Sequence, residues 1–254
     1  MKYQKIMGLA IIVMAMGLFS SCLKDVNSVF NPGLTPAVTR QYGDSALMMA
    51  STRFGIVYAT KLSSYSQGKC LLINFDYDAN TPENKNAEQR GYYSVSIVGD
   101  EAVNQQEAIK PLTATDKLLT NEQPVPFAVS PEYPDFYINL ENFLFLPSIY
   151  LSTAQQTVNW QLSYDPTQKP VVEDLKSIYS LYLRAFATTG RAAESEEKQI
   201  LSVNAFNLST FIKDIKAQGG READMYVQIH YVNQINPLDS TQFTWGATNP
   251  LFIK

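Results

Sequence analysis

The sequence predicts a mostly β protein with one short helix, because two kinds of periodicity run through it. Apolar and polar residues alternate in segments such as 71–78, 93–97 and 158–164, and a period of two is typical of strands with one buried face. Polar, turn-rich gaps separate several such segments at short intervals, which favours a sandwich or a barrel. One segment, 207–220, instead repeats its apolar residues at helical spacing.

The first 22 residues are organised as an export signal. Lys2 and Lys5 precede an uncharged run over 6–19, which ends at two serines and Cys22. A basic start, an apolar stretch of this length and small residues before a cut form a secretory signal, whereas a membrane span needs about 20 apolar residues. Small residues followed by cysteine resemble a bacterial lipoprotein signal, so we expect cleavage after residue 21 and acylation of Cys22. The alternative is an ordinary signal with a chance cysteine.

The expected mature chain is acidic. Removal of residues 1–21 leaves 18 Lys and Arg against 24 Asp and Glu, a net charge of −6. Binding of nucleic acid depends on neutralising phosphates, so no nucleic-acid partner is expected, and the lipid on Cys22 is the expected link to the membrane. Cys70 is then the only remaining cysteine, which excludes an intrachain disulfide. Its apolar surroundings in the sequence predict a small buried hydrophobe.

The N-terminal half is predicted to contain a tether and a small β-domain. Residues 22–43 hold two prolines, two glycines and no sustained periodicity, so we expect a tether from the membrane. The domain is expected over 44–110. Within it, 45–62 has the β-branched and aromatic content of strands, although Asp44 could cap a helix. The alternating segments 71–78 and 93–97 flank a polar loop and predict a long β-hairpin.

A second domain is expected over 111–254. Its lead-in, 111–135, holds five prolines and no clean pattern, which places the domain boundary near residue 110. The apolar segment 135–152 predicts more than one strand, broken near Pro147. Several further strands follow, and a helix over 207–220 is predicted to bury one stripe of apolar residues, namely Leu208, Phe211, Ile212 and Ile215.

This organisation resembles the NigD-like lipoproteins of Bacteroidetes. The resemblance is carried by Cys22 after its apolar run, by "CLLINFDY" with "GYYSVSIVGDEAV", and by "YLRAFATTGRAAESEEKQILSVNAFNLSTF". It implies an OB-like N-terminal β-domain, a C-terminal β-sandwich and a lipid-anchored place at the outer membrane, with no reaction and no catalytic residues. The chain departs from the family after Cys22, where Asp25 alone replaces the acidic run of many members. Which face of the membrane carries the protein therefore stays open.

The single histidine, His230, does not by itself predict catalysis. A hydrolytic site would need a nucleophile and an orienting group beside it, and the sequence assigns neither. A zinc site needs several nitrogen or sulfur ligands, so no metal or other cofactor is expected. The alternating pattern instead places His230 on the less apolar face of a strand.

A calcium-like opening occurs at Asp76, Asp78 and Asn80. Alternate oxygen ligands can wrap one cation, but the sixth position is Thr81 instead of glycine and the twelfth is Ala87 instead of glutamate. The favoured interpretation is a solvated loop with acidic side chains. The two carboxylates could also form a glycosidase pair, but neighbours on one strand seldom face each other across a cleft.

Two further kinds of site are predicted at the residue level. Trp245, in the loop-like "FTWGATNP", is a candidate platform for ligand contact, with packing at a sheet edge as the alternative. Asp44-Ser45-Ala46 and Asp239-Ser240-Thr241 resemble the O-glycan acceptor of exported Bacteroidetes proteins, so Ser45 and Ser240 are candidate O-glycosylation sites.

The expected function is that of a membrane-anchored, non-catalytic binding or assembly module of the cell envelope, with another envelope protein or a glycan as partner. The alternatives are a glycan- or small-ligand-binding lipoprotein and a hydrolase. Exposed sheet edges would favour the first through strand addition. A concave aromatic surface around Trp245 would favour the second, and clustered carboxylates with shifted pKa values in a cleft would favour the third.

Overall fold

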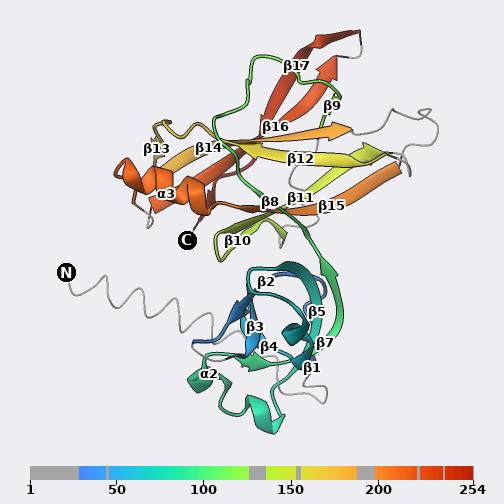
Figure 1. Ribbon diagram of the computed structural model, residues 1–254, viewed down its shortest axis with the longest axis vertical. Helices are drawn as coiled ribbons and strands as arrows, with labels where there is room; N and C mark the ends of the chain where they lie inside the picture. The colour runs from blue at the N-terminus through green and yellow to red at the C-terminus, as the bar shows by residue number, and fades with distance from the viewer. Residues whose placement is uncertain are drawn as a thin grey trace.

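The computed structural model describes residues 29–43, 46–125, 136–152, 156–187, 198–221, 224–236 and 238–253. Cys22 and Ser45 lie outside the described residues. Within the described part, no helix has both the length and the apolar character needed to cross a membrane. The chain is mostly β, as predicted, and its strands form one curled sheet followed by a two-sheet sandwich (Figure 1).

The first sheet is built by seven strands in the order β1-β5-β2-β3-β4-β6, with β7 on β5. Leu71, Ile73 and Phe75 alternate along β5 and point into its core, as their period of two predicts. The predicted hairpin is formed by β5 and β7, which pair antiparallel around a loop with two short helical turns. The elements are β1 (Val29–Phe30), β2 (Thr35–Gln41), β3 (Met48–Thr52), β4 (Gly55–Tyr58), η1 (Thr60–Ser64), β5 (Cys70–Asp78), η2 (Pro82–Asn84), α2 (Ala87–Arg90), β6 (Tyr93–Ser94) and β7 (Ser96–Ala102).

The prediction of a tether over 22–43 is wrong from residue 29 onwards, because β1 and β2 lie in this range and belong to the first sheet. Thr35–Gln41 pairs with both β3 and β5, and its first five residues are buried. The buried residues are small or polar, namely Thr35, Ala37, Val38 and Thr39 beside Pro36. No strong apolar alternation therefore marks this strand in the sequence, and its burial depends on neighbours distant along the chain.

The second part of the chain forms two sheets that face each other across the largest apolar core. The four-stranded sheet has the order β10-β11-β15-β8, and the larger sheet has β12-β14-β16-β17 as its main path. Trp160, Leu162 and Tyr164 point from the β12 segment into this core, as predicted. The strands are β8 (Asn104–Glu107), β9 (Glu122–Gln123), β10 (Ile138–Leu140), β11 (Phe143–Ser152), β12 (Val158–Ser163), β13 (Val171–Glu173), β14 (Lys176–Ala187), β15 (Lys198–Asn207), β16 (Met225–Asn236), β17 (Asp239–Ala247) and β18 (Leu251–Phe252).

The predicted helix is α3 (Ser209–Ala217). It buries the predicted stripe of Leu208, Phe211, Ile212 and Ile215 against the sandwich core. Asn207 Oδ1 accepts hydrogen bonds from the backbone N–H and the hydroxyl of Ser209, which satisfies a donor at the helix start. Gly219, with φ of 89°, follows the helix end.

The predicted break near Pro147 is wrong. Residues 143–152 form one continuous strand, and the chain turns earlier, at Glu141 and Asn142, which have φ of 49° and 68°. β10 pairs only with residues 143–145, so the described part of the chain leaves one edge of β11 open at Pro147. Proline has no backbone N–H to donate, and this is tolerated at an edge where no neighbouring strand needs that donor.

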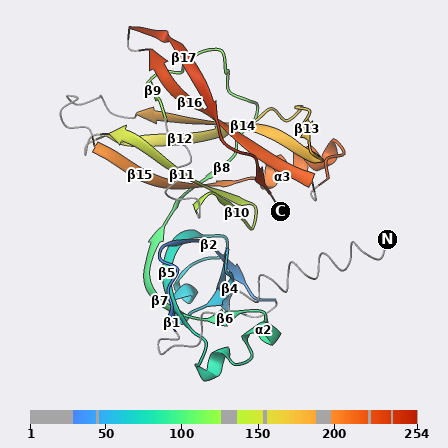
Figure 2. The same cartoon turned by 180° about the vertical axis from the view of Figure 1, so that it is seen from behind.

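An apolar cluster joins the two parts of the molecule. Cys70 and Leu72 lie on the face of β5 that points away from the first core, and they pack with Phe143, Phe145 and Ala205 from the sandwich. At the margin of this contact, Arg40 lies 2.6 Å from Glu141. Alternation predicts one buried face for β5, but the second domain covers the other face as well. Two opposite views show the curled sheet at one end of the long axis and the sandwich at the other (Figures 1 and 2).

Candidate functional site

The most distinctive feature of the sandwich is a hairpin arm, which we define as residues 233–244 of β16 and β17. Figure 1 shows it rising from the sandwich at the end opposite the first domain. β16 and β17 pair from His230 and Ala247 outwards, with irregularities in the pairing at Asn233 of β16 and over 240–242 of β17. At the tip, Leu238 is 95% exposed. The arm therefore projects polar backbone and side chains away from the core.

The outer edge of β17 carries no strand among the described residues, where β17 pairs with β16 alone. Its sequence, "DSTQFTWGA", contains one charged residue, Asp239, and neither lysine nor proline. Native edge strands are commonly protected by charge, proline, short length, bulges or a cover. β17 is nine residues long and has a single charge at its start, and its pairing is irregular only over 240–242, so its edge is regular over 243–247. This edge thus keeps the capacity to pair with another strand.

Two other long edges of the sandwich, those of β12 and β11, each carry a protective device. Ile109 covers β12, because its backbone N–H donates to Leu162 O at 2.9 Å and its carbonyl accepts from Tyr164 N. Pro147 interrupts the hydrogen-bonding capacity of β11. The β17 edge differs from both because it has neither a covering segment nor a proline among the described residues.

The base of the arm is held by a buried ion pair that the sequence did not reveal. Arg184 Nη1 lies 2.5 Å from Glu122 Oε2, and both side chains are fully buried. Arg184 also donates to the carbonyls of Ala114 and Lys117. Burial raises the pKa of Glu122, while the Leu119 N–H and Arg184 act in the opposite direction. The pair fastens the lead-in segment 114–122 to the outer face of the larger sheet. Since its members lie 62 residues apart in the chain, no local pattern could have indicated it.

Trp245 belongs to this base and lies within β17, not in a loop. Its Nε1 donates to Thr115 O at 3.0 Å, and the Arg184 guanidinium lies 5.1 Å from its ring centroid. Tyr182 contacts the same ring edge-on at 5.2 Å. The ring is half-buried by these neighbours, so this geometry matches the alternative of packing at a sheet edge. Ligand contact by Trp245 stays a prediction.

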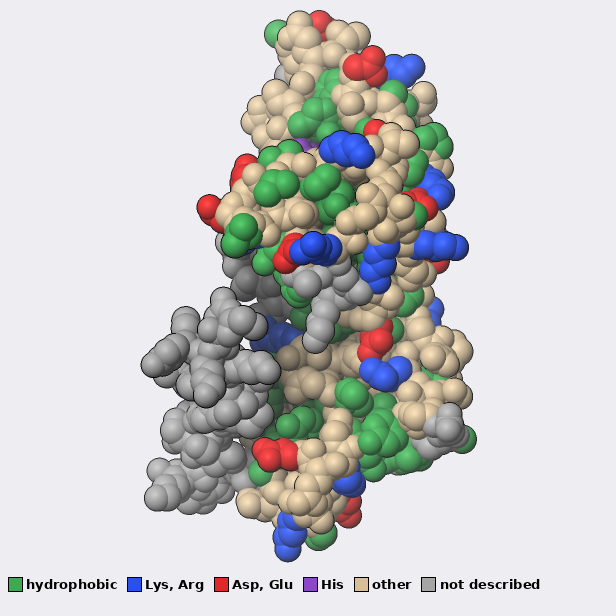
Figure 3. Space-filling model, turned by 90° about the vertical axis from the view of Figure 1, so that its left-hand side faces the viewer, with side chains coloured by type: hydrophobic (Ala, Val, Ile, Leu, Met, Phe, Trp, Pro, Cys, Tyr) green, Lys and Arg blue, Asp and Glu red, His purple; other side chains and the backbone are tan. Residues whose placement is uncertain are grey.

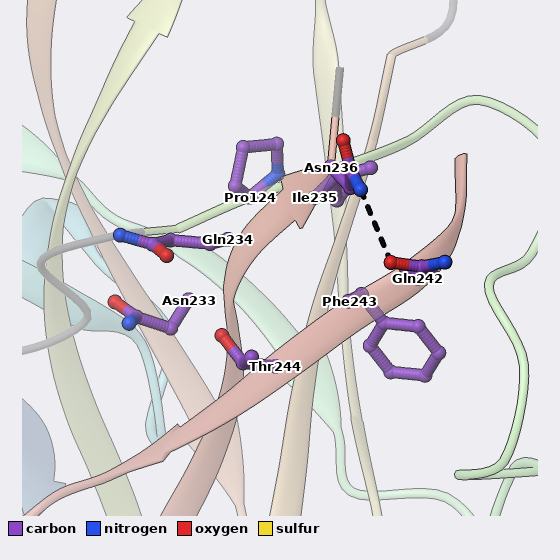
Figure 4. Close-up of a pocket in the computed structure, with 8 residues that line it drawn as sticks. All are labelled: Pro124, Asn233, Gln234, Ile235, Asn236, Gln242, Phe243 and Thr244. Atoms are coloured by element: carbon purple, nitrogen blue, oxygen red, sulfur yellow. Dashed lines mark hydrogen bonds between the residues drawn. The ribbon is translucent and has the colours of Figure 1, made fainter. Parts of the chain in front are cut away.

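A shallow pocket of about 650 Å³ lies beside the arm. Amide and hydroxyl side chains dominate its lining, and Figure 4 shows Asn236 and Gln242 hydrogen-bonded across the two strands. Neutral amides donate and accept hydrogen bonds without needing a charged ligand. The lining consists of Pro124, Asn233, Gln234, Ile235, Asn236, Gln242, Phe243 and Thr244.

His230 has a serine neighbour that sequence reasoning missed. Its Nε2 lies 3.1 Å from Ser180 Oγ, and its ring stacks on Tyr182 with centroids 4.8 Å apart. Burial lowers the pKa of His230. Among the contacts of the described residues, no carboxylate is recorded at the ring to orient it as in a hydrolytic triad. The stacking of His230 on Tyr182 follows from the pairing of β14 with β16, which places these two residues opposite each other.

The acidic positions of the first domain do not converge. Asp76 Oδ1 accepts from Asn31 Nδ2 at 2.7 Å, whereas Asp78 Oδ1 accepts from the backbone N–H of Asn80 at 2.8 Å. The described part of the chain holds no group of three or more side chains suited to a metal ion. These contacts fit the interpretation of a solvated loop.

The predicted modification sites are placed only in part. Ser240 is the second residue of β17, close to the arm tip, while Cys22 and Ser45 fall outside the described residues. Acylation of Cys22 and O-glycosylation of Ser45 and Ser240 therefore stay predictions. Figure 3 shows acidic and basic side chains interspersed on the face it draws, without a block of one sign.

Comparisons with known proteins agree with the N-terminal architecture. Residues 27–101 match the family model described as the lipoprotein OB domain. A search of curated proteins gives no match. Among solved structures, an uncharacterized protein from Parabacteroides merdae is 19% identical with a TM-score of 0.67, covering 85% of this chain and 96% of its own.

A second structure, described as a "putative lipoprotein" of Bacteroides fragilis, is 15% identical with a TM-score of 0.58 and covers 89% of this chain and 98% of its own. At these identities the matches show a shared two-part fold. A NigD-like immunity protein from Bacteroides caccae is more distant, at 10% identity and a TM-score of 0.43 over 87% of this chain and 93% of its own. The first domain thus matches the lipoprotein OB domain, which is the kind of N-terminal domain that the resemblance to NigD-like lipoproteins implied.

Proposed function

We propose that this lipoprotein is a non-catalytic binding or assembly module, held in the cell envelope at the outer membrane by lipid on Cys22, and that its partner docks along the β17 edge. The proposal rests chiefly on one observation. The arm presents a nine-residue edge strand with a single charge and no described neighbour on its outer side. Strand addition uses such an edge, because main-chain hydrogen bonds supply affinity and alternate side chains supply specificity.

Several features hold the arm in a fixed position to which a partner can bind. The Arg184–Glu122 pair and the Trp245–Thr115 hydrogen bond hold the base of the arm. Pre-organised edges lose less conformational entropy on binding than flexible ones. The exposed side chains Thr241, Gln242 and Thr244 are neutral, so they neither repel nor select a partner by charge.

The test is site-specific photo-cross-linking in a Bacteroidales host. A photoreactive residue at Gln242 is expected to give one discrete cross-linked protein, and the same residue at Val172 is the matched control. Val172 is 68% exposed and lies in β13, away from the arm. Thr244→Lys is expected to remove the Gln242 product, because a charge on an edge strand opposes pairing. Equal products at both positions, or a product that survives Thr244→Lys, would contradict the proposal.

A second candidate function is favoured by the amide-lined pocket. Its neutral donors and acceptors beside Phe243 suit the hydroxyl groups and apolar faces of a glycan. Asn233→Ala is the sharper test, because Trp245→Ala would also release the lead-in segment. Saturable glycan-array binding that is lost in Asn233→Ala but kept in Gln199→Ala would support this function. Gln199 is an exposed amide on β15, outside the pocket.

The intact mass of the native protein tests whether it is O-glycosylated. An intact mass that exceeds the acylated chain by a glycan, and that falls in Ser240→Ala or Ser45→Ala, is the expected sign of O-glycosylation. A mass that lipid alone accounts for would rule this modification out.

A further inference from the structure

One corner of the first domain is apolar and lies next to the expected anchor. Val29, Phe30 and Leu34 are 52%, 40% and 49% exposed. Isolated exposed apolar residues are common on protein surfaces, but these three fall within six consecutive positions. The first of them, Val29, follows Cys22 by only seven positions in the sequence.

The corner is continuous with the core beneath it. The ring of Phe30 meets Phe54 edge-on at 5.5 Å, and Phe54 meets the buried Phe75 at 6.3 Å. Arg53 lies over the face of Phe54, 4.4 Å from its centroid. β1 itself is fastened to the end of β5, where Val29 and Phe30 pair with Asp78 and Tyr77. The ring contacts hold Phe30 in place, and the pairing of β1 holds the sheet edge from which Val29 projects on the opposite face.

The chain between the corner and the lipid is short. Six residues separate Cys22 from Val29, so the intervening seven peptide steps span at most about 25 Å when fully extended. The polar headgroup layer itself occupies about 6 Å on each side of a bilayer. The corner therefore lies no more than about 25 Å from the acylated residue, and the connecting chain allows it to reach the headgroup layer.

We propose that Val29, Phe30 and Leu34 form a membrane-docking corner that rests in the headgroup region of the bilayer holding the lipid of Cys22. This inference rests on the anchor named in the proposed function. Asp76 and Asp78 lie beside the corner, and the mature chain is acidic, so the contact depends on apolar side chains and not on attraction to anionic lipid. Removing this exposed apolar surface from water favours the contact. Docking at this end directs the hairpin arm away from the membrane, since the arm lies at the opposite end of the molecule (Figure 1).

The experiment uses the full chain, expressed with its signal and reconstituted in phosphatidylcholine vesicles. An environment-sensitive fluorophore is attached to Leu34→Cys, and Leu238→Cys at the arm tip is the matched control, since both native side chains are exposed. Cys70 stays unlabelled because it is fully buried and burial raises the pKa of its thiol to about 12. Lipids with a quencher near the headgroup are expected to remove about half of the emission at position 34 and none at 238.

Further measurements distinguish loss of the lipid anchor from loss of docking at the corner. Phe30→Asp is expected to abolish quenching at position 34 while tryptophan fluorescence, which reports Trp160 and Trp245 of the sandwich, stays unchanged. Quenching should not increase when anionic lipid is added. An intact mass without acyl chains would refute the anchor itself, whereas an acylated chain with equal emission at 34 and 238 would overturn the docking corner alone.

Discussion

At the residue scale, the buried ion pair of Arg184 and Glu122 is the clearest source of stability that depends on two side chains. Arg184→Met leaves the Glu122 carboxylate buried without its partner, and Glu122 already has one oxygen without a hydrogen bond among the described residues. Loss of one member of such a pair costs about 3–5 kcal/mol of unfolding free energy. Urea unfolding monitored by tryptophan fluorescence measures this cost.

The matched control for this prediction is an exposed ion pair. Lys110 and Asp214 lie 2.8 Å apart with side chains 43% and 20% exposed, so Lys110→Ala is expected to cost about 1 kcal/mol or less. The double variant Arg184→Met, Glu122→Gln should recover part of the loss, because no unpaired charge then stays buried. Equal costs for Arg184→Met and Lys110→Ala would contradict the assigned role of burial.

At the element scale, the hairpin between β13 and β14 carries backbone strain that can be relieved. Asp174 and Leu175 have φ of 47° and 67°, and Leu175 is 90% exposed. A left-handed conformation costs a non-glycine residue roughly 1–2 kcal/mol, and Asp-Gly is a preferred pair for this kind of turn. Leu175→Gly is thus expected to raise the free energy of unfolding by about 1 kcal/mol in urea titrations.

Leu151→Gly tests whether the gain comes from the turn conformation. Leu151 is 53% exposed within β11 but is not among the residues with positive φ. Removing its side chain should therefore give no gain, and glycine commonly costs some stability through chain entropy. A similar increase in both variants would point to removal of exposed leucine as the cause.

The elements that the sequence predicted well are those whose signal is local. β12 and α3 each bury one regular stripe of their own residues, so alternation and helical spacing were sufficient. β2 and Pro147 were misjudged because burial of β2 comes from β3 and β5, and tolerance of Pro147 comes from an open edge. Likewise, Trp245 was placed in a loop because its partners, Thr115 and Arg184, are distant along the chain.

At the scale of the whole molecule, the two domains share an apolar cluster, so they are expected to unfold together. Phe145 is fully buried and comes from the sandwich, whereas Cys70 and Leu72 come from the first domain. Domains joined by small polar contacts can move and unfold separately. Here the contact continues the cores of both domains, and separating them would expose apolar side chains from each.

The chain carries a natural probe in each half, which makes this coupling measurable. Trp160 and Trp245 report on the sandwich, and Cys70 reports on the first domain through its reaction with a thiol reagent at pH 8, where its raised pKa keeps it protonated until unfolding. The urea transitions followed by tryptophan fluorescence and by Cys70 labelling are expected to coincide. Phe145→Ala should shift both midpoints down together, by about 3–5 kcal/mol in unfolding free energy. If Cys70 became reactive well before tryptophan fluorescence changed, the first domain would be unfolding alone, and the cluster would not be what couples the two halves.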